Sequence, residues 1–301
     1  MNAEPLYAAL EAGGTKMVCG IGSAEQGSRE TARIPTTDPD TTIGAIVDFL
    51  RAAEARHRHV QAIGIASFGP IDLDRSSPTY GMITTTPKPG WQGTDLPRRL
   101  REALGVPASI NTDVNAAALA EARNGAARGR EAVAYVTVGT GIGVGLISGG
   151  RMVQGLGHPE AGHLRLPRHP AHGRFQGICP YHGDCLEGLA SGPAIEAAWG
   201  ASLDRLAHGH AAWEAEAHYL GHLCAALILT TAPEHIVLGG GVMSQHALFD
   251  AVRGKTLELL AGYASAWTVE TVANRITQPG CVEPPGLIGA YLIAEEAARL
   301  R

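Results

Sequence analysis

Runs of apolar and β-branched residues alternate along this chain with Gly-rich turns and with stretches of helical periodicity. Residues 6–34 predict a β-meander, because Gly-Gly and Gln-Gly turns interrupt the apolar runs. Residues 41–56 predict an amphipathic helix, since one face collects Ile43, Ile46, Val47, Leu50 and Ala53. A short buried strand is expected over residues 61–67. The first part of the chain is therefore predicted to be an α/β unit.

The same mixture of strands and helices continues to the C-terminus. Asp95 is a suitable cap for a helix over 94–104, and an Ala-rich helix is expected over 115–123. The further segments expected are strands over 133–157, an ordered loop over 158–187, helices over 194–207 and 211–230, a strand over 236–238 and a final helix over 288–301. This order predicts two related α/β halves without a fixed-period repeat. We expect a small lobe, 1–118 completed by 288–301, and a large lobe, 119–287.

The composition favours a two-domain globular protein. Its 301 residues exceed the usual size of one core. The net charge of −5 and the pI near 6.2 argue against a nucleic-acid surface, which is normally basic. The N-terminus lacks a signal-peptide pattern, and the longest apolar stretch, Leu223 to Leu229, is too short to span a bilayer. We therefore expect a cytoplasmic protein that binds neither nucleic acid nor membrane, with no disulfide framework among its five cysteines.

Gly-rich turns between β-type runs indicate a phosphate-binding cleft. The first loop is Glu11-Ala12-Gly13-Gly14-Thr15-Lys16, the second is Gly139-Thr140-Gly141-Ile142-Gly143, and a third, Gly239-Gly240-Gly241, follows another apolar strand. Backbone N–H groups at glycines approach phosphate oxygens closely, while threonine hydroxyls and Lys16 add donors and a charge. The first two loops have neither Walker nor dinucleotide-fingerprint spacing, so an ordinary Gly-rich hairpin is the alternative for each of them. Together they favour two halves that face each other across the phosphates of ATP.

Asp113, directly before the Ala-rich helix, is the candidate catalytic carboxylate. A kinase that acts on a sugar hydroxyl needs one carboxylate to accept the hydroxyl proton, and an Asp at a strand end is rigidly placed for that task. An isolated Asp at this position is equally well explained as a helix N-cap. The residues alone leave the two interpretations equal.

Residues 179–185 form a C-x2-H-x2-C run within a Pro/Gly-rich loop. Cys179, His182 and Cys185 are suitably spaced to converge on one Zn²⁺, and a fourth ligand would complete a tetrahedron. Our choice for the fourth is His163, with His158, His169 and His172 as competitors. Free thiols and unrelated loop histidines are the alternative. A site with four protein ligands would be structural and would order a loop that has little core to bury.

Taken together, these segments resemble the ROK family of sugar kinases, within the actin-like ATPase superfamily, from Glu11 to about Gly289. The most specific match is Gly157-His158-Pro159-Glu160-Ala161-Gly162-His163, followed by the C-x2-H-x2-C run and residues 186–193. This motif is similar to that of the fructokinase branch of the family. The resemblance implies an α/β, two-lobed actin-like ATPase (ribonuclease H-like) fold, in which each lobe is a mixed sheet with flanking helices.

The resemblance also implies roles for individual residues. Asp113 matches the catalytic base, and Glu160 and His163 match a Glu-x-Gly-His pair whose Glu contacts the sugar and whose His binds zinc. Cys179, His182 and Cys185 match the other zinc ligands. The substrate-binding set is then Thr112, Glu160 and His163, and the nucleotide-binding set is Gly13, Gly14, Thr15, Lys16, Thr140, Gly141, Pro193, Gly239, Gly240 and Gly241. ATP, Mg²⁺ and a structural Zn²⁺ are implied, as is a homodimer.

Two positions depart from the common family pattern. Many members have Asp at the position of Glu11, whereas the fructokinase branch resembles this chain in having Glu. The Glu11 side chain either orients Mg²⁺ through water or only packs in the cleft. Thr112 stands where glucokinase-like members have Asn, so one sugar contact is expected to differ.

The expected activity is transfer of the ATP γ-phosphoryl group to a hexose, with O6 of fructose favoured. The alternatives are a kinase for glucose, mannose or an amino sugar, or a non-catalytic sugar-binding or sensor protein. A sugar-sensing repressor of this family is not expected, because the first loop begins at residue 11 and leaves no room for a DNA-binding domain before it.

Overall fold

The protein is described by a computed structural model that covers residues 5–86 and 88–299. Its contacts divide the chain into two compact units. Unit 1 comprises residues 1–128, 151–159 and 281–301, and unit 2 comprises 129–150 and 160–280. We expected the division near residue 118, and the compact units divide after helix α3 (Asp113–Asn124) instead. The assignment of functional lobes stays a prediction.

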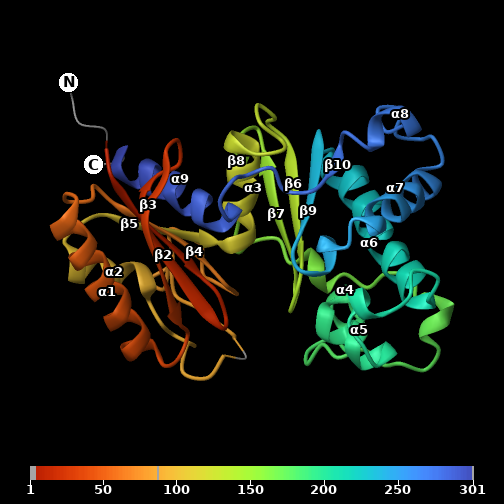
Figure 1. Ribbon diagram of the computed structural model, residues 1–301, viewed down its shortest axis with the longest axis horizontal. Helices are drawn as coiled ribbons and strands as arrows, with labels where there is room; N and C mark the ends of the chain where they lie inside the picture. The colour runs from red at the N-terminus through yellow and green to blue at the C-terminus, as the bar shows by residue number, and fades with distance from the viewer. Residues whose placement is uncertain (1–4, 87, 300–301) are drawn as a thin grey trace. The chain divides into compact units, whose positions relative to one another are not determined.

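Unit 1 is built around one mixed sheet with helices on both faces (Figure 1). Its strands lie in the order β3-β2-β1-β4-β5, with antiparallel pairing among the first three and parallel pairing from β1 to β5. Their bounds are β1 (Tyr7–Ala12), β2 (Lys16–Ser23), β3 (Gly27–Pro35), β4 (Ile63–Ser67) and β5 (Ala108–Thr112). The helices are α1 (Pro39–Arg56), α2 (Leu96–Leu104), α3 and α9 (Pro285–Arg299), and a short strand, β8 (Arg151–Met152), also belongs to this unit.

Alternation along β1 divides the core of unit 1 into two layers. Ala8 and Leu10 point into a cluster with apolar residues of α1 and α2, whereas Tyr7 and Ala9 point into a cluster with α3 and α9. Both faces of the sheet are therefore covered, as expected for a sheet with parallel strands. Helix α9 approaches β4 so closely that a Cβ at Gly64 would lie 1.9 Å from the Ala290 carbonyl oxygen.

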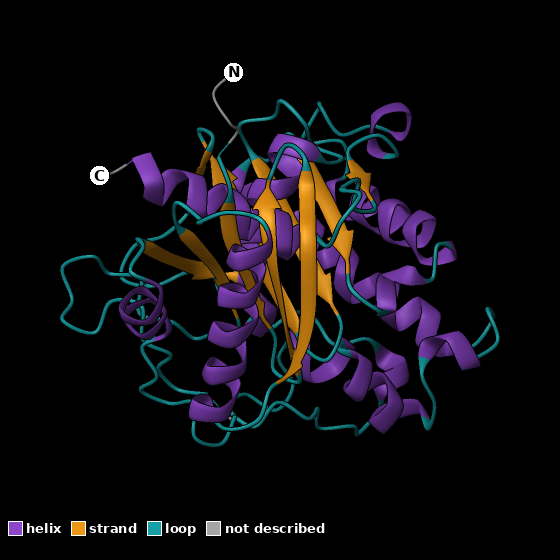
Figure 2. Cartoon of the chain, turned by 60° about the vertical axis from the view of Figure 1, so that its left-hand side comes forward, coloured by secondary structure: helices purple, strands orange, loops and turns teal. Residues whose placement is uncertain are grey.

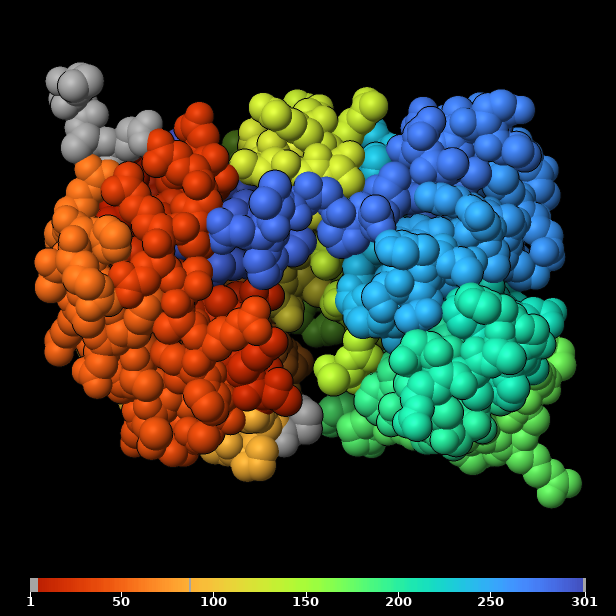
Figure 3. All heavy atoms as spheres, viewed as in Figure 1, coloured from red at the N-terminus to blue at the C-terminus, as the bar shows by residue number. Residues whose placement is uncertain are grey.

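The end of the chain completes unit 1. Helix α9 lies beside the first strands in both the ribbon and the space-filling views (Figures 1 and 3). The backbone N–H of Ala24 donates to Glu295, 271 residues further along the chain. This contact ties the C-terminal helix to the N-terminal strands within unit 1.

Unit 2 has its own mixed sheet, in which the order β10-β9-β6-β7 is built from one antiparallel and two parallel pairings. Figure 2 shows the strands in orange and the helices in purple. The strands are β6 (Val133–Val138), β7 (Ile142–Ser148), β9 (His235–Gly239) and β10 (Ile276–Thr277). The α-helices are α4 (Leu186–Ala190), α5 (Gly192–Trp199), α6 (Ala211–Thr231), α7 (Ala247–Leu260) and α8 (Val269–Val272). Short 3-10 turns, η1 (Ala161–His163), η2 (Pro170–His172), η3 (Leu203–Arg205) and η4 (Val242–Ser244), complete the unit.

Two secondary-structure predictions were wrong in their bounds. The helix expected over 194–207 is α5, which ends at Trp199 because Gly200 takes a left-handed cap conformation, with φ of 79°. The strands expected over 133–157 end at Met152. Within residues 5–86 and 88–299, none of the helices has the length and apolarity needed to cross a membrane. All five cysteines lie in these ranges, and none forms a disulfide.

Candidate active site

Asp113 is the first residue of α3, directly after β5. The cap of this helix is Thr112, whose hydroxyl accepts the backbone N–H of Asn115 at 3.2 Å. The interpretation of Asp113 as the N-cap is therefore wrong. Its carboxylate accepts the N–H of Val114 at 2.8 Å and is only half-buried, so a carboxylate is held at the strand end. Thr112 is 2% exposed, and a direct sugar contact by its hydroxyl stays a prediction.

A buried amide network supports this strand end. The side-chain oxygen of Asn111 accepts N–H groups from Thr112 and from the Asn115 side chain, both at 2.9 Å. The Asn111 amide then donates to the side chain of Gln154 at 3.0 Å, and the Asn115 amide donates to the Val153 carbonyl at 3.3 Å. Asn111 directly precedes Thr112 and Asp113, and no role was predicted for it from the sequence. Gln154 carries no signal in the sequence.

The first Gly-rich loop is the turn between β1 and β2, as predicted from the sequence. Gly14, Thr15 and Lys16 are exposed, and a Cβ at Gly13 would lie 2.6 Å from the Lys16 carbonyl oxygen. The ammonium of Lys88 donates to the Gly14 carbonyl. Lys88 therefore brings a second cation to this loop. Because it is distant from Gly14 along the chain, no local sequence pattern indicates this contact.

Glu11 is the last residue but one of β1, next to this loop. Its carboxylate lies against the first turn of α9, where a Cβ at Gly286 would approach Glu11 Oε1 to 2.6 Å. Burial raises the pKa of Glu11 above its usual range, and the nearby Lys16 acts in the opposite direction. Packing against α9 thus accounts for this side chain, while its relation to Mg²⁺ stays a prediction.

In unit 2 the second and third loops meet at the N-terminus of α5. The Gly192 N–H donates to the Gly139 carbonyl at 2.8 Å, and a Cβ at Gly139 would lie 4.0 Å from the Gly241 nitrogen. Gly240 has φ of 91°, and a Cβ there would lie 2.4 Å from the Val138 carbonyl oxygen. Glycine is therefore required at 240 by both conformation and space. Exposed Thr140 and exposed Pro193 border this meeting point.

Glu187 is a further carboxylate that the sequence reasoning did not assign. Its Oε2 accepts the Ile142 N–H at 2.9 Å and lies 2.6 Å from the place of a Cβ at Gly141, so it shapes the second loop. The negative charge of Glu187 also acts on the carboxyl group of Glu160. Burial raises the pKa of Glu160, Glu187 adds to the increase, and His163 opposes it.

The four predicted zinc ligands converge in unit 2. The ligand atoms of His163, Cys179, His182 and Cys185 all lie within 4.8 Å of one another. His163 Nδ1 lies 3.5 Å from Cys185 Sγ and 3.8 Å from Cys179 Sγ, and Cys179 Sγ lies 3.6 Å from His182 Nδ1. Ligands of a tetrahedral zinc site are separated by about 3.4–3.8 Å, given Zn–S and Zn–N bonds of about 2.3 and 2.0 Å. The residues therefore fit Zn²⁺ in both number and chemistry.

The competing histidines lie elsewhere. His158 belongs to unit 1. His172 packs among Phe175, Trp199 and Tyr219, and Tyr219 Oη lies 3.0 Å from its Nδ1. His169 faces Glu214, with 3.8 Å between Nε2 and Oε1.

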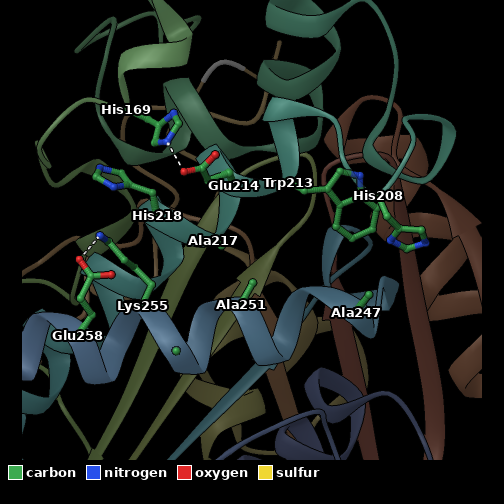
Figure 4. A pocket seen from close by; sticks show the side chains of 11 residues that line it. His169, His208, Trp213, Glu214, Ala217, His218, Ala247, Ala251, Lys255 and Glu258 are labelled. Atoms are coloured by element: carbon green, nitrogen blue, oxygen red, sulfur yellow. Dashed lines mark hydrogen bonds and ion pairs between the residues drawn. The ribbon is translucent and has the colours of Figure 1, made fainter.

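His169 also lines a cavity of about 610 Å³ in unit 2. Figure 4 shows it between α6 and α7, with Lys255 paired to Glu258 at 2.7 Å on the α7 side. The described residues that line this cavity include none of the predicted phosphate-loop or zinc residues. The cavity is thus separate from the predicted site.

Comparison with known proteins identifies the family. The ROK family model matches residues 7–297. The chain belongs to the ROK family. Within this family it is 43% identical to the fructokinase of Zymomonas mobilis, over 97% of each chain. It is 41% identical to the fructokinase of Lactococcus lactis, over 85% of this chain and 86% of that protein. The crystal structure of the Thermus thermophilus ROK hexokinase matches with a TM-score of 0.78 and 28% identity, covering 98% of this chain and all of that one.

The ROK match confirms the predicted fold class. This ROK protein has two mixed sheets with flanking helices and the actin-like ATPase fold of its structural relatives. The residue roles that the resemblance implies stay predictions.

Proposed function

We propose that this protein is an ATP-dependent hexose kinase that converts fructose to fructose 6-phosphate. The observation that carries the kinase proposal is Asp113, a half-buried carboxylate at a strand end whose helix is already capped by Thr112. Asp113 is therefore not needed as a cap. Identity of 41–43% to proteins named fructokinase supports fructose as the sugar.

The proposed chemistry is in-line phosphoryl transfer. Asp113 accepts the proton of the sugar hydroxyl as the γ-phosphoryl group moves, and Glu160 and His163 contact the sugar. Backbone N–H groups of the Gly-rich loops hold the ATP phosphates, with Lys16 supplying positive charge and Thr15 and Thr140 supplying hydroxyls. Mg²⁺ bound to ATP would neutralise part of the phosphate charge. The nucleotide-binding set is the one proposed from the sequence.

The zinc proposal concerns order in the loop that carries Glu160. A bound Zn²⁺ would supply structural cross-linking of His163, Cys179, His182 and Cys185. Because His163 follows Glu160 by three residues, fixing His163 also restricts Glu160. The two cysteines and two histidines at tetrahedral spacing support this role.

The kinase proposal is tested by Asp113→Asn, which keeps the shape of the side chain and removes its basicity. We expect kcat with fructose to fall by about 10²- to 10⁴-fold, the usual contribution of a general base, while the KM for fructose changes little. Asp48→Asn, at an exposed position of α1, is the matched control and should keep wild-type kcat. An Asp113→Asn enzyme with normal kcat would refute the assignment.

The sugar is tested with a panel of hexoses in an ADP-release assay with Mg²⁺. We expect the highest kcat/KM for fructose. Strong turnover of glucose, mannose or an amino sugar without turnover of fructose would support the alternative kinases. Sugar binding without ADP release would support a non-catalytic sugar-binding protein.

A homodimer and a cytoplasmic location are also proposed, on the resemblance and the sequence pattern alone. Light scattering of the purified protein at micromolar concentration should give twice the mass of 31.3 kDa. Cell fractionation should recover the protein with cytoplasmic markers.

A further inference from the structure

The segment 153–158, which leads to Glu160, is attached to the rest of unit 1 by side-chain hydrogen bonds. Two of them are the bonds to Val153 and Gln154 from the amide network around Asn111 and Asn115. The third is at the end of the segment, where His158 Nε2 accepts the backbone N–H of Ile71 at 3.2 Å. We call residues 153–158 the strap.

His158 fits closely against the loop at residues 68–71. A Cβ at Gly69 would lie 3.2 Å from both Cε1 and Nε2 of the imidazole, so glycine leaves the room that the ring occupies. Burial lowers the pKa of His158, and a hydrogen bond with the Pro159 backbone opposes the change. A neutral ring is required here, because Nε2 accepts only when it carries no proton.

The loop at 68–71 leaves the sheet at the same edge as the candidate base. Strand β4 ends at Ser67, which pairs with Thr112 in the parallel ladder between β4 and β5. Asp113 is the next residue. His158 is therefore anchored on the loop next to the strand end that carries Asp113, and Glu160 follows two residues later.

We propose that His158 is a positioning residue for the hexose, which fixes the strap on the Ile71 N–H so that Glu160 starts from a fixed point beside the strand end that carries Asp113. This role rests on the proposed function of Glu160 and Asp113. It requires no contact between His158 and the sugar. Loss of the acceptor leaves the Ile71 N–H without its partner and loosens the chain that carries Glu160.

The first test compares His158→Leu, which removes the acceptor, with His158→Gln, whose side-chain oxygen reaches a similar distance. For His158→Leu we expect the KM for fructose to rise about 5- to 30-fold, as for one lost buried hydrogen bond, with the KM for ATP and the zinc content unchanged. His158→Gln should recover most of the loss. A purely structural role would change both KM values together, so an equal rise, or an unchanged KM for fructose, overturns the proposal.

Gly69→Ala provides a second, independent variant if His158→Leu does not fold. Its methyl group must displace the imidazole by a few tenths of an ångström, so the KM for fructose should rise in the same direction by a smaller factor. A Gly69→Ala enzyme with wild-type KM for fructose would contradict the role of His158.

The second test does not depend on catalysis. Hydrogen exchange of the substrate-free protein should show faster exchange at Ile71 and over the strap in His158→Leu and wild-type protection in His158→Gln. Unchanged exchange in His158→Leu overturns the anchor. A wild-type protein that phosphorylates no hexose overturns the proposed function and the positioning role with it. Fructose turnover combined with an unchanged KM in His158→Leu overturns only the positioning role.

Discussion

Protonation of His172 is predicted to destabilise the protein at mildly acidic pH. His172 is 5% exposed, and Tyr219 Oη lies 3.0 Å from its Nδ1. The Tyr219 oxygen accepts the His169 backbone N–H, so its own proton is available to His172. Nδ1 of the neutral ring then accepts the hydroxyl proton of Tyr219. Protonation of Nδ1 would place its N–H against the Tyr219 O–H, so that two donors face each other without an acceptor. Burial, together with the smaller effects of the charges of Arg168, His169 and His218, lowers the pKa of His172 to about 4.

The magnitude follows from the difference in pKa between the unfolded and folded states. The unfolded value of 6.5 and the folded value of about 4 differ by roughly 2.5 units, which corresponds to about 3 kcal/mol at about 1.4 kcal/mol per unit. Because the folded pKa is the lower one, the unfolded state binds the extra proton. The stabilisation is complete above pH 6.5, decreases as the pH falls toward 4, and changes no further below that. At pH 5 the loss is about 2 kcal/mol.

The assay is urea unfolding at pH 7.5, 6 and 5 at constant salt, with His172→Asn as the comparison. Asn keeps an acceptor for Tyr219 and cannot be protonated in this range. The variant loses packing at every pH, so the comparison uses only the pH dependence of the difference in the free energy of unfolding between the two proteins. From pH 7.5 to 5 the wild-type free energy of unfolding should fall by about 2 kcal/mol more than that of the variant. Parallel pH profiles would refute the reasoning.

Three further predictions concern other parts of unit 2. Gly240→Ala should destabilise the protein by about 2 kcal/mol or more, because φ of residue 240 is 91° and the Val138 carbonyl occupies the place of a Cβ. The same change should raise the KM for ATP. Urea denaturation measures the stability, and steady-state kinetics measure the KM. Glu216 is 2% exposed with a pKa raised by burial, so Glu216→Met should stabilise at pH 7.5 by about 1–3 kcal/mol, with the gain shrinking toward pH 4.5. Cys179→Ser should lower bound zinc below one per chain by elemental analysis, whereas Cys224→Ser, outside the ligand cluster, should not.

Local sequence signals were sufficient for the parts of this protein whose geometry depends on neighbouring residues. The turn between β1 and β2 follows from Gly13 and Gly14 between apolar runs, since a tight turn needs little beyond its own residues. The candidate zinc ligands at 179, 182 and 185 lie within seven residues, and their spacing alone predicted that they would converge.

Other features depend on residues that are distant along the chain. Choosing His163 over three other histidines required the placement of residue 163 against residues 179–185, which the structure brings together. Thr and Asp are both suitable N-cap residues, so the sequence does not distinguish Thr112 from Asp113 as the cap of α3. The backbone geometry of the structure assigns the cap to Thr112. Lys88, at the first loop, lies in no local motif, and Glu187 lies within the matched residues 186–193, where nothing local indicates its contact with the second loop.

The sequence by itself determined the α/β class and the Gly-rich loops, because these are encoded by periodicity and short spacing, and it predicted the candidate base and the candidate zinc ligands. The tertiary structure decided which segments meet: Gly139 with Gly192, Asn111 with Gln154, and Ile71 with His158. Such contacts form only when the strands of a sheet are ordered and paired. Their energies depend on distance in space, for which separation along the chain is no guide.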